Sequence, residues 1–288
     1  MLSLQILANG LVLGGLYACI AAGFSLVWGV LNVINILHGS FIVLGGYLAF
    51  YAYTLFGIHP FVSILIAAPL FFALGYALQK TLINRMIAAP VLLTLSLTFG
   101  LDLILSNGML VAFTADFKKL TLDPPLGVLN LGGIALPVDR LFAMALALAL
   151  TGLLYLVLSR SRIGRAIVAV RMDREAAALM GVNVKRIYAV TFGLGALMAG
   201  ASGPLLAMIF PISPLSGPVY LGKAFVICVL GGLGSVPGAM IGGLALGVVE
   251  SFGGLWFGPE HAVTLSFTLL ILMLLFRPTG LLGRAGYA

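Results

Sequence analysis

The stretch LGKAFVICVLGGLGSVPGAMIGGLALGVVES, from Leu221 to Ser251, is apolar and rich in glycine, and carries charge only at Lys223 and Glu250, near its two ends. A transmembrane helix needs about 20 predominantly apolar residues, so this stretch is long enough to cross a bilayer. Its middle, from Gly231 to Gly238, combines glycines with Pro237, and both residue types interrupt helical hydrogen bonding. We predict a membrane segment that is broken at this point.

The composition of the whole chain is that of an integral membrane protein. Of its 288 residues, 62% are hydrophobic and 8% are charged, and the mean hydropathy is +1.20. Soluble domains are about half apolar and a quarter charged, so one water-soluble core could not hold these side chains. We expect residues 1–288 to form a single transmembrane domain with an all-α fold, a polytopic helical bundle of about eight or more segments.

Seven further apolar runs are long enough to be spans, or nearly so. They are Gln5 to Val30, Ile36 to Leu55, Phe61 to Ile83, Val91 to Phe113, Leu141 to Leu158, Ile187 to Phe210 and Ala262 to Phe276. Met1 to Ala8 lacks the positive charges of a secretory signal, so the first run is expected to stay in the mature protein.

Basic residues are concentrated in one connecting segment, from Ser159 to Tyr188. Short loops rich in Lys and Arg stay on the cytoplasmic side, so we predict a cytoplasmic loop over residues 159–186. Other basic side chains at segment ends, Lys80, Arg85, Arg277 and Arg284, are expected on the same side. Residues 115–140 and the N-terminus then fall outside.

The number of crossings constrains the glycine-rich stretch. Because Ile187 to Phe210 leads outward, Leu221 to Ser251 must return to the outside before Ala262 to Phe276 can end inside. One continuous helix fails this count, whereas two spans or two half-helices both satisfy it. Non-helical backbone at membrane depth is tolerated only where protein or water covers it, so the break is a candidate for the lining of a path.

A second polar interruption separates the first two spans. Asn32, Asn35, His38 and Ser40 stand close together there, as an inner turn or a second break. The tetrapeptide VLGG at residues 43–46 also recurs at residues 229–232. Paired glycine-interrupted segments are typical of duplicated transporter folds, so we predict a possible internal repeat.

The positive charge does not indicate nucleic-acid binding. The formal net charge is +7, but basic residues at the ends of apolar runs anchor to lipid headgroups and set orientation. We therefore predict the lipid bilayer, and no nucleic acid, as a partner. Cys19 and Cys228 lie in separate apolar segments, and we expect them to pack as small hydrophobic side chains.

No enzyme or cofactor site is indicated. Gly217 to Lys223 has the outline of the phosphate loop G-x-x-x-x-G-K-[ST], but Ala224 replaces the required hydroxyl residue and no strand precedes it. His38 has no second ligand at metal spacing, so we expect a packing histidine rather than a proton carrier. Asp102 and His261 lack neighbours for nucleophilic or acid–base chemistry. We predict no catalytic residue, no metal and no cofactor.

Two features inside the apolar runs have both a structural and a functional interpretation. Ionised groups near membrane spans are costly, so Lys223 and Glu250 are either functional or reach toward the headgroups. Glycines at spacing four form smooth helix stripes, which are expected to pack within the subunit rather than in a dimer. These stripes are Gly234, Gly238 and Gly242, and Gly243 and Gly247.

The centre of the basic segment, DREAAALMG at residues 173–181, predicts a short helix. Asp173 is a natural N-cap and Gly181 a natural stop. The helix could be an ordinary connector on the headgroups. Its exposed side would carry alanines and Met180 rather than charges, which favours insertion into a groove on a partner.

Three segments carry a resemblance to a known family. They are Asn32 to Gly39 (NVINILHG), Ser161 to Ala166 (SRIGRA) running into Gly181-Val182-Asn183, and Lys223 to Gly243. With them, nearly the whole chain resembles the permease family of branched-chain amino-acid ABC importers. Ser40 departs from the family, whose members often have a glutamate after His-Gly.

A second, shorter resemblance concerns the helix in the basic segment. Glu175-Ala176-Ala177 and Gly181 match the first part of the E-A-A-x-x-x-G signature with which importer permeases dock on the ATPase. Thr191-Phe192-Gly193 stands where the signature continues with an Ile and a Leu-Pro.

The resemblance implies a multi-pass subunit of the bacterial inner (plasma) membrane. Its implied partners are a second homologous permease subunit, two cytoplasmic ATP-binding subunits that hydrolyse the ATP, and a periplasmic solute-binding protein. The solute expected is a branched-chain or other neutral amino acid, with urea or short amides as the alternative. A stand-alone secondary transporter or channel and an intramembrane enzyme are rival hypotheses, but both need paired polar groups that the sequence does not indicate.

Two sets of site residues follow from these arguments. The expected ATPase-coupling residues are Arg165, Asp173, Glu175, Ala176, Ala177 and Gly181. The expected candidates for the translocation path are Asn32, Asn35, His38, Ser40, Lys223, Gly231, Gly232, Gly234, Ser235 and Pro237.

Overall fold

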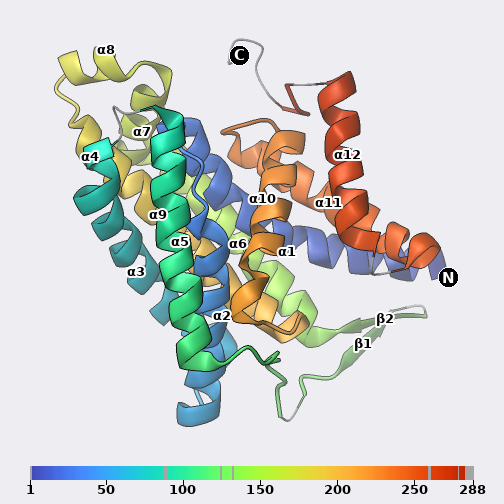
Figure 1. The fold of residues 1–288 in the computed structure, drawn as a ribbon. Helices are drawn as coiled ribbons and strands as arrows, with labels where there is room; N and C mark the ends of the chain where they lie inside the picture. The colour runs from blue at the N-terminus through green and yellow to red at the C-terminus, as the bar shows by residue number, and fades with distance from the viewer. Residues whose placement is uncertain are drawn as a thin grey trace.

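The structure, a computed structural model, describes residues 2–86, 90–123, 125–131, 133–258, 261–277 and 279–282. Helices make up most of it (Figure 1). In chain order they are α1 (Leu2–Leu31), α2 (Leu37–Phe56), α3 (Pro60–Leu78), the π-helix η1 (Gln79–Ile83), α4 (Asn84–Met86), α5 (Val91–Phe113), α6 (Val138–Arg160), α7 (Arg162–Met172), α8 (Arg174–Leu179), α9 (Val184–Ile209), the 3-10 helix η2 (Pro214–Ser216), α10 (Gly217–Gly231), α11 (Val236–Phe257) and α12 (Ala262–Phe276).

The predicted polytopic bundle is confirmed. Within the described residues, eight helical segments are long and apolar enough to cross a membrane. They are Leu2–Leu31, Leu37–Phe56, Pro60–Met86, Val91–Phe113, Val138–Arg160, Val184–Ile209, Pro214–Gly231 and Val236–Phe257. The predicted span at Ala262–Phe276 is a shorter apolar helix. The glycine-rich stretch forms two spans, α10 and α11, because the helix is interrupted between Gly231 and Val236.

Two helices, α1 and α9, form the centre of the bundle. Both are almost completely buried within the protein, and α9 packs against α2, α3 and α1. The contacts are backbone to backbone: a methyl group added at Gly45 of α2 would lie 2.2 Å from the carbonyl oxygen of Gly200 of α9. Moving apolar surface from lipid into a protein contact gains little free energy. Membrane helices therefore associate through close contacts between small residues such as these.

The glycines of α11 pack within the subunit, as predicted. Gly243 and Gly247 face α1, whereas Gly238 and Gly242 face α10. A methyl group at Gly247 would lie 2.4 Å from both the carbonyl oxygen of Gly10 and the backbone nitrogen of Gly14. These four glycines therefore seat α11 against two different helices. Gly234, the third residue predicted for the first stripe, lies before α11, and a methyl group there would lie 2.8 Å from the Cα of Gly29 in α1.

A β-hairpin that the sequence analysis did not predict lies at one end of the bundle (Figure 1). Strands β1 (Val128–Leu131) and β2 (Ile134–Pro137) pair antiparallel, with Leu131 opposite Ile134. The amide of Gln5 is hydrogen-bonded to both backbone groups of Ala135, at 2.8 Å each. The start of α1 and the hairpin therefore lie at the same end, which agrees with the predicted order of crossings.

Helices α7 and α8 and the described C-terminal residues lie at the opposite end (Figure 1). Arg171 of α7 donates a 2.7 Å hydrogen bond to the carbonyl oxygen of Gly234, in the break between α10 and α11. Leu281 and Leu282 donate backbone hydrogen bonds to Leu230 and Gly231. The end that carries the basic segment thus also holds the break and residues 281–282. Arg284 lies outside the described residues.

The two VLGG segments stand in different settings. Residues 43–46 lie inside α2, where Gly45 and Gly46 contact α9. Residues 229–232 lie at the end of α10, where Gly232 has a φ of +98°. Their shared sequence reflects close packing in one case and helix termination in the other.

Replacement of Gly247 by alanine is expected to lower the free energy of unfolding by about 1–3 kcal/mol, because the added methyl group forces α1 and α11 apart. Gly254→Ala is the matched control on the same helix, since nothing lies within 4 Å of a methyl group there. Thermal unfolding of the purified proteins in detergent compares the two. Equal stability of the two variants would contradict the tight α1–α11 contact.

Candidate functional site

The helix predicted in the basic segment is present as α8, and its caps are those predicted. The Asp173 side chain accepts hydrogen bonds from the backbone N–H groups of Glu175 and Ala176, both at 2.9 Å. Gly181 adopts a φ of +83°, a conformation that favours glycine and ends the helix. The local sequence is therefore sufficient to define this helix.

Helix α8 presents apolar side chains to the outside of the protein. Leu179 is 88% exposed and Met180 is 85% exposed, whereas Ala177 is buried against the rest of the chain. Glu175 and Ala176 are exposed as well. An exposed apolar tip on a charged segment is typical of a protein–protein contact.

Helix α7 links α8 to the transmembrane helices. It begins at Ser161, whose side chain accepts a 2.8 Å hydrogen bond from the backbone N–H of Gly164. Arg165, a predicted coupling residue, is exposed and donates a long 3.4 Å bond to the carbonyl oxygen of Arg160. At the other end of α7, Arg171 reaches the break at Gly234. Helix α7 therefore connects α8 to the break between α10 and α11.

The second predicted interruption, at residues 32–36, returns the chain to the interior of the bundle. The Nε2 atom of His38, in the first turn of α2, lies 2.9 Å from the carbonyl oxygen of Ile20 in α1, so Nε2–H donates this bond. His38 is fully buried and packs edge-on against Phe24. His38 therefore packs within the bundle, and its place among the path candidates stays a prediction. Asn32 has a φ of +52°, and Asn35 is fully buried.

Helix α2 therefore begins beside the middle of α1, and α10 begins next to it. A methyl group at Gly39 would lie 2.2 Å from the carbonyl oxygen of Gly217, the first residue of α10. Two helix N-terminal ends thus meet inside the bundle. Such ends carry partial positive charge, which favours a negative group nearby.

A carboxylate stands at this point. Ser40 of α2 donates a 2.5 Å hydrogen bond to Oδ1 of Asp102. Asp102 is the central residue of α5, since Val91 and Phe113 are each eleven residues away. Ser40 is 1% exposed and Asp102 is partly buried. Ser40 is a predicted path residue, whereas no partner is predicted for Asp102, because the two are 62 positions apart in the sequence.

Polar side chains continue along α5 on both sides of Asp102. Thr94, Thr98, Asp102 and Ser106 recur at spacing four, so they follow one face of the helix. Thr94 and Thr98 are buried, and Thr98 also donates a 2.9 Å bond to the carbonyl oxygen of Ile34. The face of α5 toward the start of α2 is therefore polar.

Side chains with hydroxyl groups continue along α2 toward the hairpin end. Tyr47 is fully buried and stacks on Phe113 with ring centroids 4.5 Å apart. One helical turn further, the hydroxyl of Tyr51 accepts a 2.7 Å hydrogen bond from Lys118. We call the set Tyr51, Tyr47, Ser40, Asp102 and Thr98 the α2–α5 polar line.

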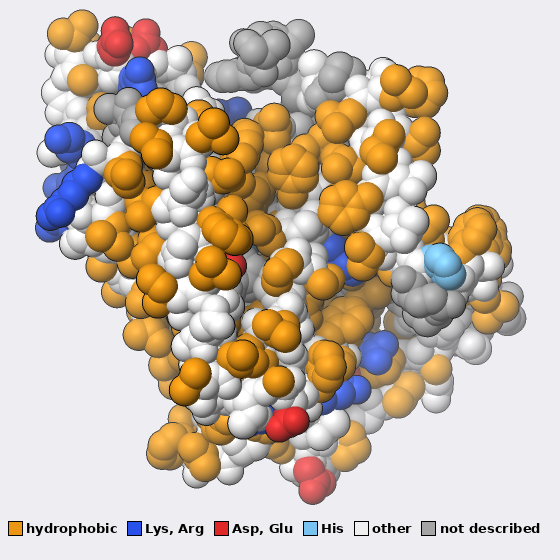
Figure 2. Space-filling model, in the orientation of Figure 1, with side chains coloured by type: hydrophobic (Ala, Val, Ile, Leu, Met, Phe, Trp, Pro, Cys, Tyr) orange, Lys and Arg blue, Asp and Glu red, His pale blue; other side chains and the backbone are white. Residues whose placement is uncertain are grey.

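Figure 2 shows how little charge the face formed by α5, α10 and α12 carries. Apolar side chains cover most of it, with small acidic and basic areas recessed at mid-height beside α10. An apolar groove of about 370 Å³ lies between α2, α3 and α5, and its lining includes Phe41 and Leu105 but neither Ser40 nor Asp102.

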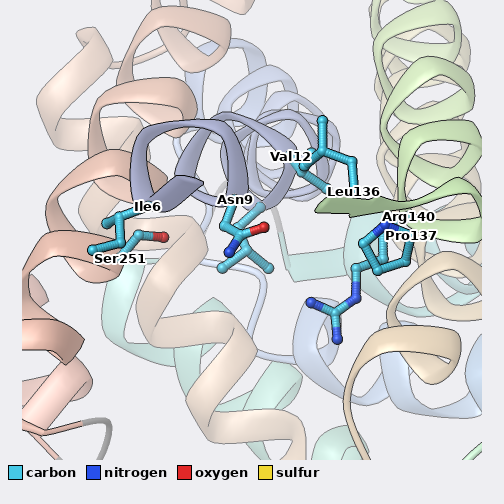
Figure 3. Close-up of a pocket in the computed structure, with 8 residues that line it drawn as sticks. Ile6, Asn9, Val12, Leu136, Pro137, Arg140 and Ser251 are labelled. Carbon is cyan, nitrogen blue, oxygen red and sulfur yellow. The ribbon is translucent and has the colours of Figure 1, made fainter. Parts of the chain in front are cut away.

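A separate pocket of about 240 Å³ lies at the hairpin end. Figure 3 shows Asn9 from α1, Arg140 from α6 and Ser251 from α11 around it, with Ile6 and Val12. This pocket combines one cation with amide and hydroxyl groups on an apolar lining. Its position beside β2 places it on the surface that is predicted to face outside.

The described structure distributes the predicted path residues over three places. Asn35, His38 and Ser40 lie together at the start of α2. Gly231, Gly232, Gly234, Ser235 and Pro237 lie at the opposite end, where Ser235 caps α11 by accepting a 3.1 Å bond from Gly238 N–H. Lys223 lies in the third place, within α10.

Comparison with known proteins places the chain in a family. The profile of the family described as "Branched-chain amino acid transport system / permease component" matches residues 6–276. The chain belongs to this permease family. It is 36% identical to the high-affinity branched-chain amino acid transport system permease protein BraD of Pseudomonas aeruginosa, over 98% of this chain and 96% of BraD.

Other relatives agree with this assignment. The permease protein LivH of Salmonella typhimurium is 35% identical over 98% of this chain and 96% of its own length. A probable LivH of Methanocaldococcus jannaschii is 29% identical, over 97% of this chain and 92% of its own. The fold is similar to that of PsaBC from Streptococcus pneumoniae in complex with Fab, with a TM-score of 0.51 at 14% identity, covering 95% of this chain and 92% of that one.

In this member of the permease family, Lys223 and Glu250 form an ion pair in which Glu250 is buried and Lys223 is largely buried. Lys223 Nζ lies 2.8 Å from Oε2 of Glu250 and 2.6 Å from the hydroxyl of Tyr17. The Tyr17 hydroxyl itself donates to Glu250 at 2.8 Å, and Ser266 donates to Oε1 of Glu250 at 2.5 Å. This network joins α1, α10, α11 and α12. The sequence identified both charges but not their pairing.

Removal of either charge of this pair is expected to destabilise the permease by about 3 kcal/mol, because the remaining charge stays buried without its partner. Lys223→Met and Glu250→Gln are the single variants. The double variant should be more stable than the sum of the two losses predicts, since it leaves no unpaired charge. A double-mutant cycle of thermal unfolding in detergent measures the coupling, and additive losses would contradict the ion pair.

Proposed function

We propose that the chain is the membrane-spanning permease subunit of an ABC importer for branched-chain amino acids. The full-length match to the permease family carries this proposal. We place the protein in the bacterial inner membrane, with a second homologous permease, two cytoplasmic ATP-binding subunits that hydrolyse ATP, and a periplasmic binding protein that delivers the solute. The names of the relatives favour amino acids over urea or short amides.

We assign the contact with the ATPase to α8 and its flanks. The residues of this contact are Arg165, Asp173, Glu175, Ala176, Ala177 and Gly181, together with the exposed tip of Leu179 and Met180. The physical support is that this tip is apolar, exposed and rigidly capped. The Arg171 bond to Gly234 supports a mechanical route from α8 to the turn formed by Gly231, Gly232, Gly234, Ser235 and Pro237.

We assign the solute path to the α2–α5 polar line. A zwitterion crossing a bilayer needs polar groups along its route, since the loss of hydration is otherwise uncompensated. The line supplies hydroxyl groups and one carboxylate from near the hairpin end to the start of α2. We add Asn32 and Asn35, from the segment that leads into α2, and His38 of its first turn at the inner end, and the pocket with Arg140 at the outer surface.

The proposal is tested by reconstituting this chain with its companion subunits in proteoliposomes. Uptake of labelled leucine should require ATP, the ATP-binding subunits and the solute-binding protein together. Uptake by the purified chain alone, driven by an ion gradient or by none, would instead support a secondary transporter or channel.

Leu179→Glu is expected to reduce ATP-driven leucine uptake by about tenfold or more, because the charge replaces an apolar contact at the centre of the proposed docking surface. Leu126→Glu is the control: it places the same charge at an exposed apolar position near the hairpin, at the other end of the protein. Uptake and co-purification of the ATP-binding subunits are measured for both. Undiminished uptake in Leu179→Glu would remove the docking role of α8.

A further inference from the structure

Asp102 is a carboxylate at the centre of a helix that is otherwise fit for lipid. An ionised side chain is costly at such a depth unless it faces a polar partner or water. In the described structure its hydrogen-bond donor is the hydroxyl of Ser40, at 2.5 Å. A single hydroxyl occupies one of about four acceptor positions on a carboxylate. Oδ2 therefore retains capacity for a strong donor.

Ser40 holds Asp102 in place, and no basic side chain of the described residues forms an ion pair with it. Ser40 lies against the first residue of α10, since a methyl group at Gly217 would be 3.4 Å from its hydroxyl oxygen. The basic side chain of α10, Lys223, is already engaged by Glu250 and Tyr17. Lys118 is bonded to Tyr51 near the hairpin end. Both of these described lysines that flank the line thus have other partners.

A cation supplied from outside the protein suits this position. Branched-chain amino acids have an apolar side chain, a carboxylate and one ammonium group, and the ammonium is a charge-assisted donor to a carboxylate. Leu101, the neighbour of Asp102 in the sequence, and Leu105 line the apolar groove between α2, α3 and α5, which can accept an aliphatic side chain. The site is therefore complementary to a ligand that carries an α-ammonium group beside a hydrocarbon chain.

We propose that Asp102, held by Ser40, binds the ammonium group of the amino acid during its passage between α2 and α5. This inference rests on the proposed function and adds to it the residue that recognises the solute inside the membrane. Asp102 supplies the charge, and Ser40 is a positioning residue that orients the carboxylate.

A purely structural α2–α5 bond is the alternative, and two variants separate it from solute binding. Asp102→Asn removes the charge but keeps an oxygen that can accept the Ser40 hydrogen bond. Ser40→Ala removes that bond but keeps the charge. Solute binding predicts that Asp102→Asn is the damaging change, whereas a structural bond predicts that Ser40→Ala is.

The experiment uses the complete importer in proteoliposomes, with labelled leucine and its binding protein. Asp102→Asn is expected to lower the amount of leucine moved per ATP hydrolysed by about tenfold or more, the typical effect of losing a hydrogen bond to a charged group. ATP hydrolysis and the thermal unfolding midpoint should stay near their original values. Ser40→Ala and Asp102→Glu keep the carboxylate but change its position, so each should retain part of the uptake and lose less of it than Asp102→Asn does. Asn107→Ala is the control on α5, because the Asn107 amide is exposed and bonds to Leu103 of its own helix.

The outcomes are distinct. Unchanged uptake in Asp102→Asn, or an equal loss of uptake and stability in Ser40→Ala, overturns the role of Asp102 while ATP-dependent leucine uptake by the unmodified protein stands. Failure of the unmodified importer to move leucine overturns the proposed function itself. If Asp102→Asn cannot be recovered folded, loss of uptake in both Ser40→Ala and Asp102→Glu overturns the inference, and retained uptake in both supports it.

Discussion

Close backbone contact between helices is the constraint on which this structure depends. In a bilayer, apolar side chains gain little by leaving lipid for protein, so helices must associate through dispersion and hydrogen bonds at short range. The contacts between Gly45 and Gly200, and between Gly247 and α1, bring backbones together where any side chain would intervene. The central helices α1 and α9 are buried because their neighbours can approach them in this way.

Tight packing leaves few positions for polar groups, and each described intramembrane charge has a specific environment. Lys223 and Glu250 neutralise each other and join four helices through Tyr17 and Ser266. Asp102 differs, because its described hydrogen-bond donor is a hydroxyl group. A satisfied ion pair stabilises one arrangement of helices, whereas an incompletely paired carboxylate can accept a ligand. The completeness of its pairing thus distinguishes a structural charge from a candidate transport site.

The two ends of the molecule differ in the side chains that they present. At the hairpin end, Gln5 bonds to β2 and Lys118 bonds to Tyr51, so polar side-chain contacts attach β2 and the segment after α5 to the helices. At the other end, α8 carries exposed apolar side chains, and α7 connects it to the turn between α10 and α11. A partner that moves α8 would act on the two helices that hold the buried ion pair. The proposed ATPase contact and the proposed solute path are therefore connected through packed helices.

The sequence by itself determined the membrane class, most span positions, the break after Gly231 and the capped helix α8. These features are local: hydropathy over about 20 residues and the caps Asp173 and Gly181 act within one segment. Short strands β1 and β2 were missed because four-residue strands carry little pattern. Only the tertiary structure decided that Lys223 meets Glu250, that Ser40 meets Asp102 and that the break lies beside α7. Those pairs depend on which helices become neighbours. The close backbone contacts at glycines, which form across the whole bundle, decide this.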